Sequence, residues 1–349
     1  MSPKSAGYRM PAEWEPHAAT WLALPYLEEE WAGHLAEARA ELLAFAEALV
    51  EEGAERVRLL VADPIAVEEL RSRPWFRRVE LLELPYGDCW VRDTSAIGLV
   101  GARDRASVRF AFDGWGGKFP MPGDAGLSER VAEHLGWPAF SFPFVLEGGA
   151  IEVDGRGTCL TTRDCLLAAR GLGDEATVDR ALAEAFGLER VIWLDGALKN
   201  DHTDGHIDTL ARFVAPGEVV IMYAEGPDPN AETFQSLARQ LELARDARGA
   251  PLRVHRIATP GVIEDEEGRL MPASYCNFYI ANEAVLVPAY GCPADEAARA
   301  GIAALFPGRK TVSVPARHVL VGGGALHCAS QPEPAERDAV GLRKERGRG

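Results

Sequence analysis

The 349-residue sequence lacks the patterns that mark several common classes of protein. Its six cysteines form no CxxC pair and no zinc-like spacing, and six in a chain of this length do not suggest a disulfide scaffold. A reducing cytoplasm is therefore the expected location. No GxGxxG or GxxxxGK[ST] motif follows a strand-like segment, which argues against an ordinary doubly wound α/β sheet.

Positive charge and long apolar runs are also scarce. The chain has 37 Lys and Arg against 53 Asp and Glu, for a formal net charge of −16. This argues against a nucleic-acid partner, since phosphate binding needs a basic surface, and it is compatible with a cationic substrate. The N-terminal segment has no apolar signal-peptide core, and no apolar run reaches the roughly 18 residues of a membrane span. We therefore expect a cytoplasmic protein without membrane contact.

The chain does contain a regular alternation of helical and strand-like segments. An amphipathic helix is predicted over 35–52, because Leu42, Phe45 and Leu49 recur at helical spacing. Further helices are predicted over 64–71, 125–135, 174–186, 231–247 and 294–305, and strands include 207–214 and 319–322. Similar units thus recur about every 50 to 60 residues. No flexible linker divides them, so one domain over 1–349 is expected.

The run from Val321 to Gln331 is the most informative segment, because three glycines, 322–324, are followed closely by Cys328. Glycine tolerates conformations and close approaches that a Cβ forbids, so the run predicts a strained turn that presents the thiol to a small ligand. The alternative is an ordinary glycine loop beside a buried, inert cysteine.

A second segment, from Asn200 to Leu210, is rich in histidine and aspartate. If it enters a strand, His206 and Asp208 project to one face and offer an acid/base group beside an anion. The alternatives are a solvated strand face and a metal site.

Two tryptophans and one glutamate complete the pattern. Trp90 near Asp93 suits a cationic ligand, provided that the chain bends there, and Trp115 among glycines suits the wall of a narrow pocket. The competing interpretation is a core tryptophan with a surface Arg92–Asp93 pair. Glu147 lies in an apolar stretch and is costly to bury alone, so it pairs with a histidine or lies on a surface turn.

The order of these segments resembles the agmatine deiminase (agmatine iminohydrolase) family of the guanidine-modifying, or pentein, superfamily. The motifs that carry the resemblance are RMPAEWEPH (9–17), WVRD (90–93), FDGWGGK (112–118), EGG (147–149), DGHID (204–208), YCNFYIAN (275–282) and GGGALHC (322–328). They span nearly the whole chain.

The resemblance implies a five-fold pseudosymmetric α/β propeller of ββαβ units around a central channel. It has one domain with a core over about 9–335, and a tail, 336–349, that is expected to be disordered. The implied reaction is hydrolysis of the guanidinium of agmatine to N-carbamoylputrescine and ammonia, without metal or cofactor. A homodimer is also expected.

Carried over residue by residue, the resemblance implies Cys328 as nucleophile, His206 as general acid/base and Glu147 as the group that orients His206. Asp93 and Asp208 would grip the guanidinium nitrogens. The other implied substrate contacts are Trp90, Trp115, Asp204, Gly323 and Gly324. Two positions depart from the family pattern: Asp113 replaces an asparagine, and His202 replaces an acidic residue. The second departure leaves Glu13, Asp204 and His202 as alternatives for holding the distal amine.

These residue types fit the implied chemistry. Paired carboxylates accept charge-assisted hydrogen bonds from a guanidinium and fix its plane for attack by a thiolate. Nearby aspartates should raise the pKa of Cys328 in the empty site, and the cationic substrate and protonated His206 should lower it. His206 then protonates the departing ammonia and activates the water that hydrolyses a covalent thiouronium.

Three other functions remain open at the level of sequence. The chain could be a peptidyl-arginine deiminase or another small-guanidine deiminase of the same superfamily. It could be a non-catalytic polyamine-binding module. It could also be a metal-dependent hydrolase that uses His202, Asp204, His206 and Asp208.

Overall fold

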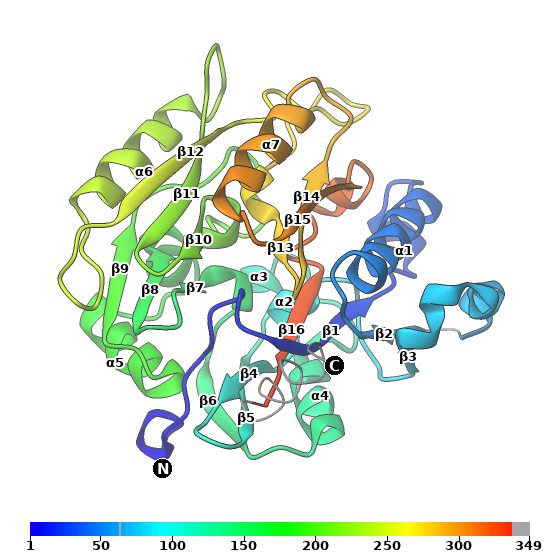
Figure 1. Cartoon of the computed structure of the whole chain (residues 1–349), viewed down its shortest axis with the longest axis horizontal. Coiled ribbons are helices and arrows are strands. Elements are labelled where there is room, and N and C mark those ends of the chain that lie inside the picture. The colour runs from blue at the N-terminus through cyan, green and yellow to red at the C-terminus, as the bar shows by residue number, and fades with distance from the viewer. Residues whose placement is uncertain (63, 337–349) are drawn as a thin grey trace, which may run out of the picture.

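A computed structural model of the protein describes residues 1–62 and 64–336. These residues form five separate sheets in a mixed α/β fold. The longer helices α1, α4, α5, α6 and α7 lie around the outside of the view in Figure 1, and the short helices α2 and α3 lie near its middle. The predicted disordered tail lies almost entirely outside the described residues.

Each sheet combines an antiparallel pair with a parallel pair that is joined through a helix, because parallel neighbours need a crossover connection. β4 (Ile97–Val100) pairs antiparallel with β5 (Arg105–Ala111), which pairs parallel with β6 (Ala139–Val145) after α4 (Leu127–Leu135). Three more sheets repeat this ββαβ order: β7 (Glu152–Val153), β8 (Thr158–Thr162), α5 (Glu175–Phe186) and β9 (Arg190–Leu194); β10 (Ala211–Ala215), β11 (Glu218–Tyr223), α6 (Ala231–Leu243) and β12 (Arg253–Ala258); β13 (Tyr279–Ile280), β14 (Ala284–Ala289), α7 (Asp295–Leu305) and β15 (Lys310–Pro315).

The fifth sheet is assembled from both ends of the described chain. β16 (Ser330–Pro334) pairs antiparallel with β1 (His17–Ala23), which pairs parallel with β2 (Val57–Leu60) after α1 (Leu35–Glu51). A fourth strand, β3 (Val79–Leu82), extends this sheet next to β2. The predicted recurrence of similar units is therefore confirmed among the described residues.

Local sequence explains the helices that were predicted best. In α1, Leu42, Phe45 and Leu49 are almost completely buried, as their spacing predicts, and each such side chain contributes about 1.5–3 kcal/mol of burial energy. α5 is capped at its N-terminus by Asp174, whose carboxylate accepts the Thr177 N–H at 2.7 Å. At its C-terminus the cap is Gly187, which has the left-handed conformation (φ 70°).

Three predicted elements differ from the structure. Residues 64–71 form a 3₁₀ segment, η3 (Pro64–Ser72), instead of an α-helix, and α6 ends at Leu243, four residues earlier than predicted. The predicted strand over 319–322 is a 3₁₀ turn, η10 (Val319–Gly322). It is closed by Gly323, whose φ of 100° breaks the extended backbone that a strand requires.

A short helical turn precedes the first strand of each ββαβ unit. Four of these turns are α2 (Val91–Thr94), η6 (Gly148–Ala150), η8 (Ile207–Thr209) and η9 (Tyr275–Asn277), and residues 326–329 form the fifth, before β16. α2 contacts η6, η6 contacts η8, and η8 contacts η9. Segments far apart in sequence are therefore neighbours here, and these turns carry the site.

The other short helices are peripheral to this series or flank it. They are η1 (Lys4–Ala6), η2 (Glu28–Glu30), η4 (Pro74–Arg78), α3 (Gly114–Gly117), η5 (Asp124–Gly126) and η7 (Asp164–Ala169). No helix among residues 1–62 and 64–336 is long and apolar enough to cross a membrane.

Arg212, on β10, binds groups from three other parts of the chain, around residues 13, 152 and 276–278. Its fully buried guanidinium donates to Glu152 at 2.9 Å, to Glu13 at 2.8 Å, and to the carbonyls of Cys276 and Phe278 at 3.2 and 2.6 Å. A buried charge is tolerated only when it is paired and hydrogen-bonded. Among the described residues, Arg212 is the ion-pair partner of Glu152, and it shares Glu13 with Arg92 and His327.

We expect Arg212→Met to lower the free energy of unfolding by about 3–5 kcal/mol, because the buried Glu152 carboxylate loses its cation and Glu13 loses one of its three. Urea unfolding followed by far-UV circular dichroism measures the change. The matched control is Arg253→Met on β12, whose arginine is 72% exposed and pairs with Glu218 at 3.7 Å; its effect should be no more than about 1 kcal/mol. Equal effects of the two substitutions would contradict the prediction.

Candidate active site

The predicted catalytic residues lie in or directly before four of the five turns that open the ββαβ units. Asp93 lies in α2, Glu147 directly precedes η6, His206 directly precedes η8, Asp208 lies in η8, and Cys328 lies in the turn before β16. The structure therefore brings together in one region these five residues, which are spread over positions 93 to 328 of the sequence.

Cys328 opens onto a cavity of about 80 Å³. The side chain is only 4% exposed, and the cavity is walled by aromatic, acidic and glycine residues. Its lining residues are Glu30, Asp88, Trp90, Asp93, Trp115, Phe119, Met121, His202, Thr203, Val321, Gly322, Gly323, Gly324 and Cys328. Carboxylates with aromatic walls suit a delocalised cation.

The glycine run packs closely around the thiol and Trp90. A Cβ on Gly324 would lie 2.6 Å from the Trp90 ring and 3.2 Å from Cys328 Sγ, and one on Gly322 would lie 2.7 Å from the same ring. The predicted close approach of backbone to the site is therefore present. Gly323 and Gly324 both line the cavity. Gly323 has a φ of 100°, in the left-handed region that glycine adopts readily and other residues avoid.

Two side chains hold the Cys328 sulfur. The Asn277 amide donates to Sγ at 3.0 Å, and Sγ lies 3.4 Å from Asp208 Oδ2. Burial raises the pKa of the Cys328 thiol well above its usual value, and the negative charges of Asp208 and Asp93 raise it further. The direction is the one expected from sequence for an empty site.

Asp208 is completely buried and shares one oxygen between two partners. His327 Nδ1 lies 2.7 Å from Oδ2, the oxygen that also faces Cys328, while Oδ1 has no hydrogen-bond partner. Burial acts to raise the pKa of Asp208, but the hydrogen bond and charge of His327 lower it below the usual value. An ionised carboxylate with a free oxygen therefore lies beside the thiol.

Asp93, His206 and Asp208 converge on Gly149. A Cβ at this position would lie 2.5 Å from His206 Nδ1, 2.9 Å from Asp93 Oδ1 and 3.2 Å from Asp208 Oδ2, so only glycine fits. Asp93 is held in place by the Gly149 N–H and by Trp115 Nε1, each at 2.9 Å. Its Oδ2 lies 3.7 Å from His206 Nδ1.

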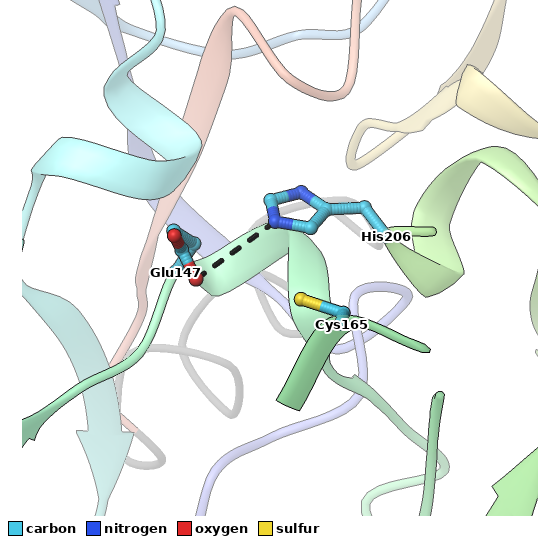
Figure 2. Close-up of side chains that lie close together, drawn as sticks. All are labelled: Glu147, Cys165 and His206. Carbon is cyan, nitrogen blue, oxygen red and sulfur yellow. Dashed lines mark ion pairs between the residues drawn. The ribbon is translucent and has the colours of Figure 1, made fainter. Parts of the chain in front are cut away.

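Glu147, Cys165 and His206 lie close together with their polar ends facing one another (Figure 2). His206 Nε2 is 3.9 Å from Glu147 Oε2, and the other Glu147 oxygen accepts from Arg170 at 2.6 Å. Burial acts to lower the pKa of His206, but Asp93, Cys165 and Glu147 raise it well above its usual value. These neighbours therefore favour the imidazolium form of His206 in the empty site.

The same three side chains are a possible metal set, since one donor atom from each lies within 4.8 Å of the others. Metal ligands must be deprotonated. Burial raises the pKa of Cys165, and the pKa of His206 is raised as well, so both favour their protonated forms. The positively charged Arg170 already pairs with Glu147. These observations favour an ion-paired cluster around Glu147 over a metal site.

The metal set considered from sequence, His202 with Asp204, His206 and Asp208, does not form among the described residues. Asp204 is instead paired with Lys118 at 2.7 Å and Arg170 at 2.9 Å, and it does not line the cavity. Its place in substrate binding stays a prediction. His202 does line the cavity, next to Phe119, and burial lowers its pKa.

The reason given for pairing His206 with Asp208 was wrong, although the two do converge. His206 is not in a strand; it precedes the 3₁₀ turn η8, and the strand begins only at Ala211. Gly205 and Asp204 both have positive φ, which turns the backbone before His206. The bend required between Trp90 and Asp93 is present as α2, and both residues line the cavity. The alternative of a surface Arg92–Asp93 pair is excluded, since both are buried and Arg92 pairs with Glu13.

Sequence reasoning missed three residues that contact the site. Asn277 binds the sulfur, and its Oδ1 also accepts the backbone N–H groups of His327 and Cys328 at 3.0 and 3.2 Å. His327 links Asp208 to Glu13, and Arg170 binds Glu147. Asn277 lies inside the motif YCNFYIAN (275–282) and His327 inside GGGALHC (322–328), so the polar residues within these motifs were the signal that could have identified both.

Comparison with known proteins places this geometry in a family. Residues 9–334 match the model of the Porphyromonas-type peptidyl-arginine deiminases. The agmatine deiminase of Pseudomonas aeruginosa (strain LESB58) is 34% identical, over 97% of this chain and 98% of that protein. The structure of the agmatine deiminase of Enterococcus faecalis has a TM-score of 0.88 and 30% identity, with 96% of this chain and 98% of that chain covered.

Two further structures bear on the site and on the fold. A cysteine-to-serine variant of the C. jejuni agmatine deiminase with substrate bound has a TM-score of 0.85 and 28% identity, covering 94% of this chain and 97% of that chain. A more distant structure, DDAH from Pseudomonas aeruginosa, has a TM-score of 0.52 and 18% identity over 91% of this chain and 99% of that chain, and shows a likeness of fold alone.

The raised pKa of Cys328 predicts slow alkylation by iodoacetamide at pH 7.5, because only the thiolate reacts and its fraction is smaller than in free cysteine. Asp208→Asn removes a negative neighbour, lowers the pKa, and should speed modification at this pH about threefold or more. Peptide mass spectrometry measures the adduct at residue 328. Glu296→Gln, on an exposed part of α7, is the control, and an unchanged rate in Asp208→Asn would refute the electrostatic account.

Proposed function

The chain belongs to the Porphyromonas-type peptidyl-arginine deiminase family, and we propose that it is an agmatine deiminase, a C–N hydrolase that converts agmatine and water to N-carbamoylputrescine and ammonia. The observation that carries this proposal is the Cys328 thiol, 3.4 Å from Asp208, in a cavity that Asp93 and two tryptophans also line. Identity of 34% over nearly the whole of an agmatine deiminase supports it.

Asp93 and Asp208 bind the guanidinium in this proposal. The Gly149 N–H and Trp115 Nε1 fix Asp93, and Asp208 keeps an unpaired oxygen, so both can accept from guanidinium N–H groups without reorganising. Trp90 and Trp115 line the cavity and contact the planar cation or its alkyl chain.

Substrate binding activates the nucleophile. In the empty site, burial and two carboxylates keep Cys328 as a thiol. A guanidinium placed between those carboxylates neutralises them and supplies positive charge beside the sulfur, so the thiol releases its proton to water and the thiolate forms when the substrate is present. The Asn277 N–H stabilises that thiolate. The thiolate then attacks the guanidinium carbon.

His206 serves as the general acid and then the general base. Its imidazolium donates a proton to the departing ammonia as the tetrahedral adduct collapses to a thiouronium on Cys328. The neutral imidazole then takes one proton from the water that attacks the thiouronium carbon. As the C–S bond breaks and the urea carbonyl forms, the remaining hydroxyl proton passes to the departing sulfur, which restores the Cys328 thiol and frees the product. Glu147 orients His206, with Arg170 holding Glu147 in turn.

We also propose that the five sheets form a five-fold pseudosymmetric propeller in one domain. The repeated ββαβ order supports this arrangement, as do the contacts from one opening turn to the next and the outer position of the five long helices (Figure 1). Cytoplasmic location and a homodimer stay predictions.

Cys328→Ser should reduce turnover of agmatine by about 10³-fold or more, since the hydroxyl is a far weaker nucleophile at this position. His206→Ala should also lose turnover, but in this variant a covalent adduct of agmatine minus ammonia should accumulate on Cys328. Intact-protein mass spectrometry detects the adduct. Cys292→Ser, at a half-buried cysteine outside the cavity, is the control. Full activity in Cys328→Ser would remove the mechanism.

A substrate panel tests the function itself. Ammonia release from agmatine, arginine and a blocked peptidyl-arginine should be fastest with agmatine. A preference for the peptide would select the peptidyl-arginine deiminase alternative. Binding of agmatine without ammonia release, together with no labelling of Cys328 by a haloacetamidine, would select the non-catalytic binding module. Loss of activity after chelator treatment would select a metal-dependent hydrolase.

A further inference from the structure

The cavity holds two acidic residues that the proposed chemistry does not use, Asp88 and Glu30. Asp88 is only 2% exposed. Within the described residues, its carboxylate accepts a hydrogen bond from the adjacent Cys89 N–H at 2.8 Å. Glu30 ends η2, is exposed, and lines the same cavity. Neither forms an ion pair with any residue in the described parts of the chain.

The surroundings of Asp88 add negative charge and no partner cation. Asp124 lies next to it, 1% exposed, with Oδ1 bound by the Gly87 N–H at 2.7 Å and Oδ2 without a hydrogen-bond partner. Burial, then Asp124 and Glu30, raise the pKa of Asp88 to about 7, while the Cys89 N–H and the Trp31 indole act to lower it. A buried carboxylate in such a field gains stability from any cation that reaches it.

The Trp90 ring packs against the glycine run beside the nucleophile. Its Cζ3 lies 2.6 Å from the Cβ position of Gly324, which is 3.2 Å from Cys328 Sγ, and its Cζ2 lies 2.7 Å from the Cβ position of Gly322. Trp31 stacks on Trp90 with ring centres 6.1 Å apart. Asp88, Glu30 and Cys328 line the same cavity as Trp90, so a ligand that packs on this ring has both the thiol and the two acids within the same space.

The other acids considered for the distal amine are occupied elsewhere. Glu13 binds Arg92, Arg212 and His327, and Asp204 binds Lys118 and Arg170. His202 lines the cavity, but burial lowers its pKa, so it is neutral at pH 7 and offers no charge to an ammonium.

We propose that Asp88, assisted by Glu30, binds the distal ammonium of the substrate and makes the enzyme selective for a guanidine that carries a second cation at the far end of an alkyl chain. The inference rests on the proposed function. Trp90, which lines the cavity, covers the alkyl chain between the two charged ends.

The test compares agmatine with n-pentylguanidine, which has a methyl group where agmatine has its ammonium. The measured quantity is the ratio of kcat/KM for the two guanidines. In Asp88→Asn this ratio should fall about tenfold or more, as expected for a lost charge-assisted hydrogen bond, and in Glu30→Gln about threefold. Glu28→Gln alters another acid of η2 that does not line the cavity, and it should leave the ratio unchanged.

The outcomes separate this inference from the function on which it rests. If the wild-type enzyme releases no ammonia from agmatine, the proposed function is wrong. If it does, and Asp88→Asn keeps the wild-type ratio, or His202→Ala lowers the ratio in its place, the anchor is not Asp88. If Asp88→Asn loses both activities, Glu30→Gln decides, and a wild-type ratio in that variant overturns the proposal.

Discussion

The site depends on carboxylates that are buried together and neutralised by buried cations. Glu13 has a pKa held well below its usual value despite burial, because Arg212, His327 and Arg92 surround it. Desolvating an ion costs several kcal/mol, and only close pairing offsets that cost. Because Arg92 in α2, Arg212 on β10 and Glu13 before β1 belong to three different units, their ion pairs also hold these units together. The charges that the chemistry requires are thus part of what stabilises the fold.

One charge near the nucleophile remains incompletely compensated. Asp208 has His327 as its partner, but its Oδ1 stays unpaired and its Oδ2 faces the Cys328 sulfur. Together with Asp93, this leaves the empty cavity short of positive charge. In the proposed mechanism the substrate supplies that charge, and the thiol stays protonated until it arrives. Such an arrangement limits alkylation and oxidation of a nucleophile that must otherwise be highly reactive.

Much of this site was predictable from sequence, because the chemistry lies in short motifs that each carry their own glycines. The resemblance in motif order indicated Cys328, Asp93 and His206, and helical periodicity located α1 and α5. Period-two reasoning failed for His206 and Asp208, since positive φ at Asp204 and Gly205 turns the chain out of the extended conformation. No strand pattern contains that information.

The partners of the site residues were harder to predict than the residues themselves. Asn277 lies 51 positions from Cys328, and Arg170 lies 23 positions from Glu147. Such contacts follow from the way in which successive turns meet, which a single sequence does not specify. Asp88 was overlooked for a different reason: it lies two residues before Trp90, outside the motif WVRD (90–93), and only the cavity reveals that it faces the same space.

The pairing of β16 with β1 has a consequence for biosynthesis. His17 lies opposite Pro334, so the strand that directly follows Cys328 joins a sheet whose other members emerge from the ribosome first. Closing so long a loop costs entropy that local contacts do not repay. Four of the units can form on the growing polypeptide, but the reactive sulfur takes its place only after β16 has been synthesised and has paired with β1. A chain that stops before β16 therefore has no means of catalysing the reaction.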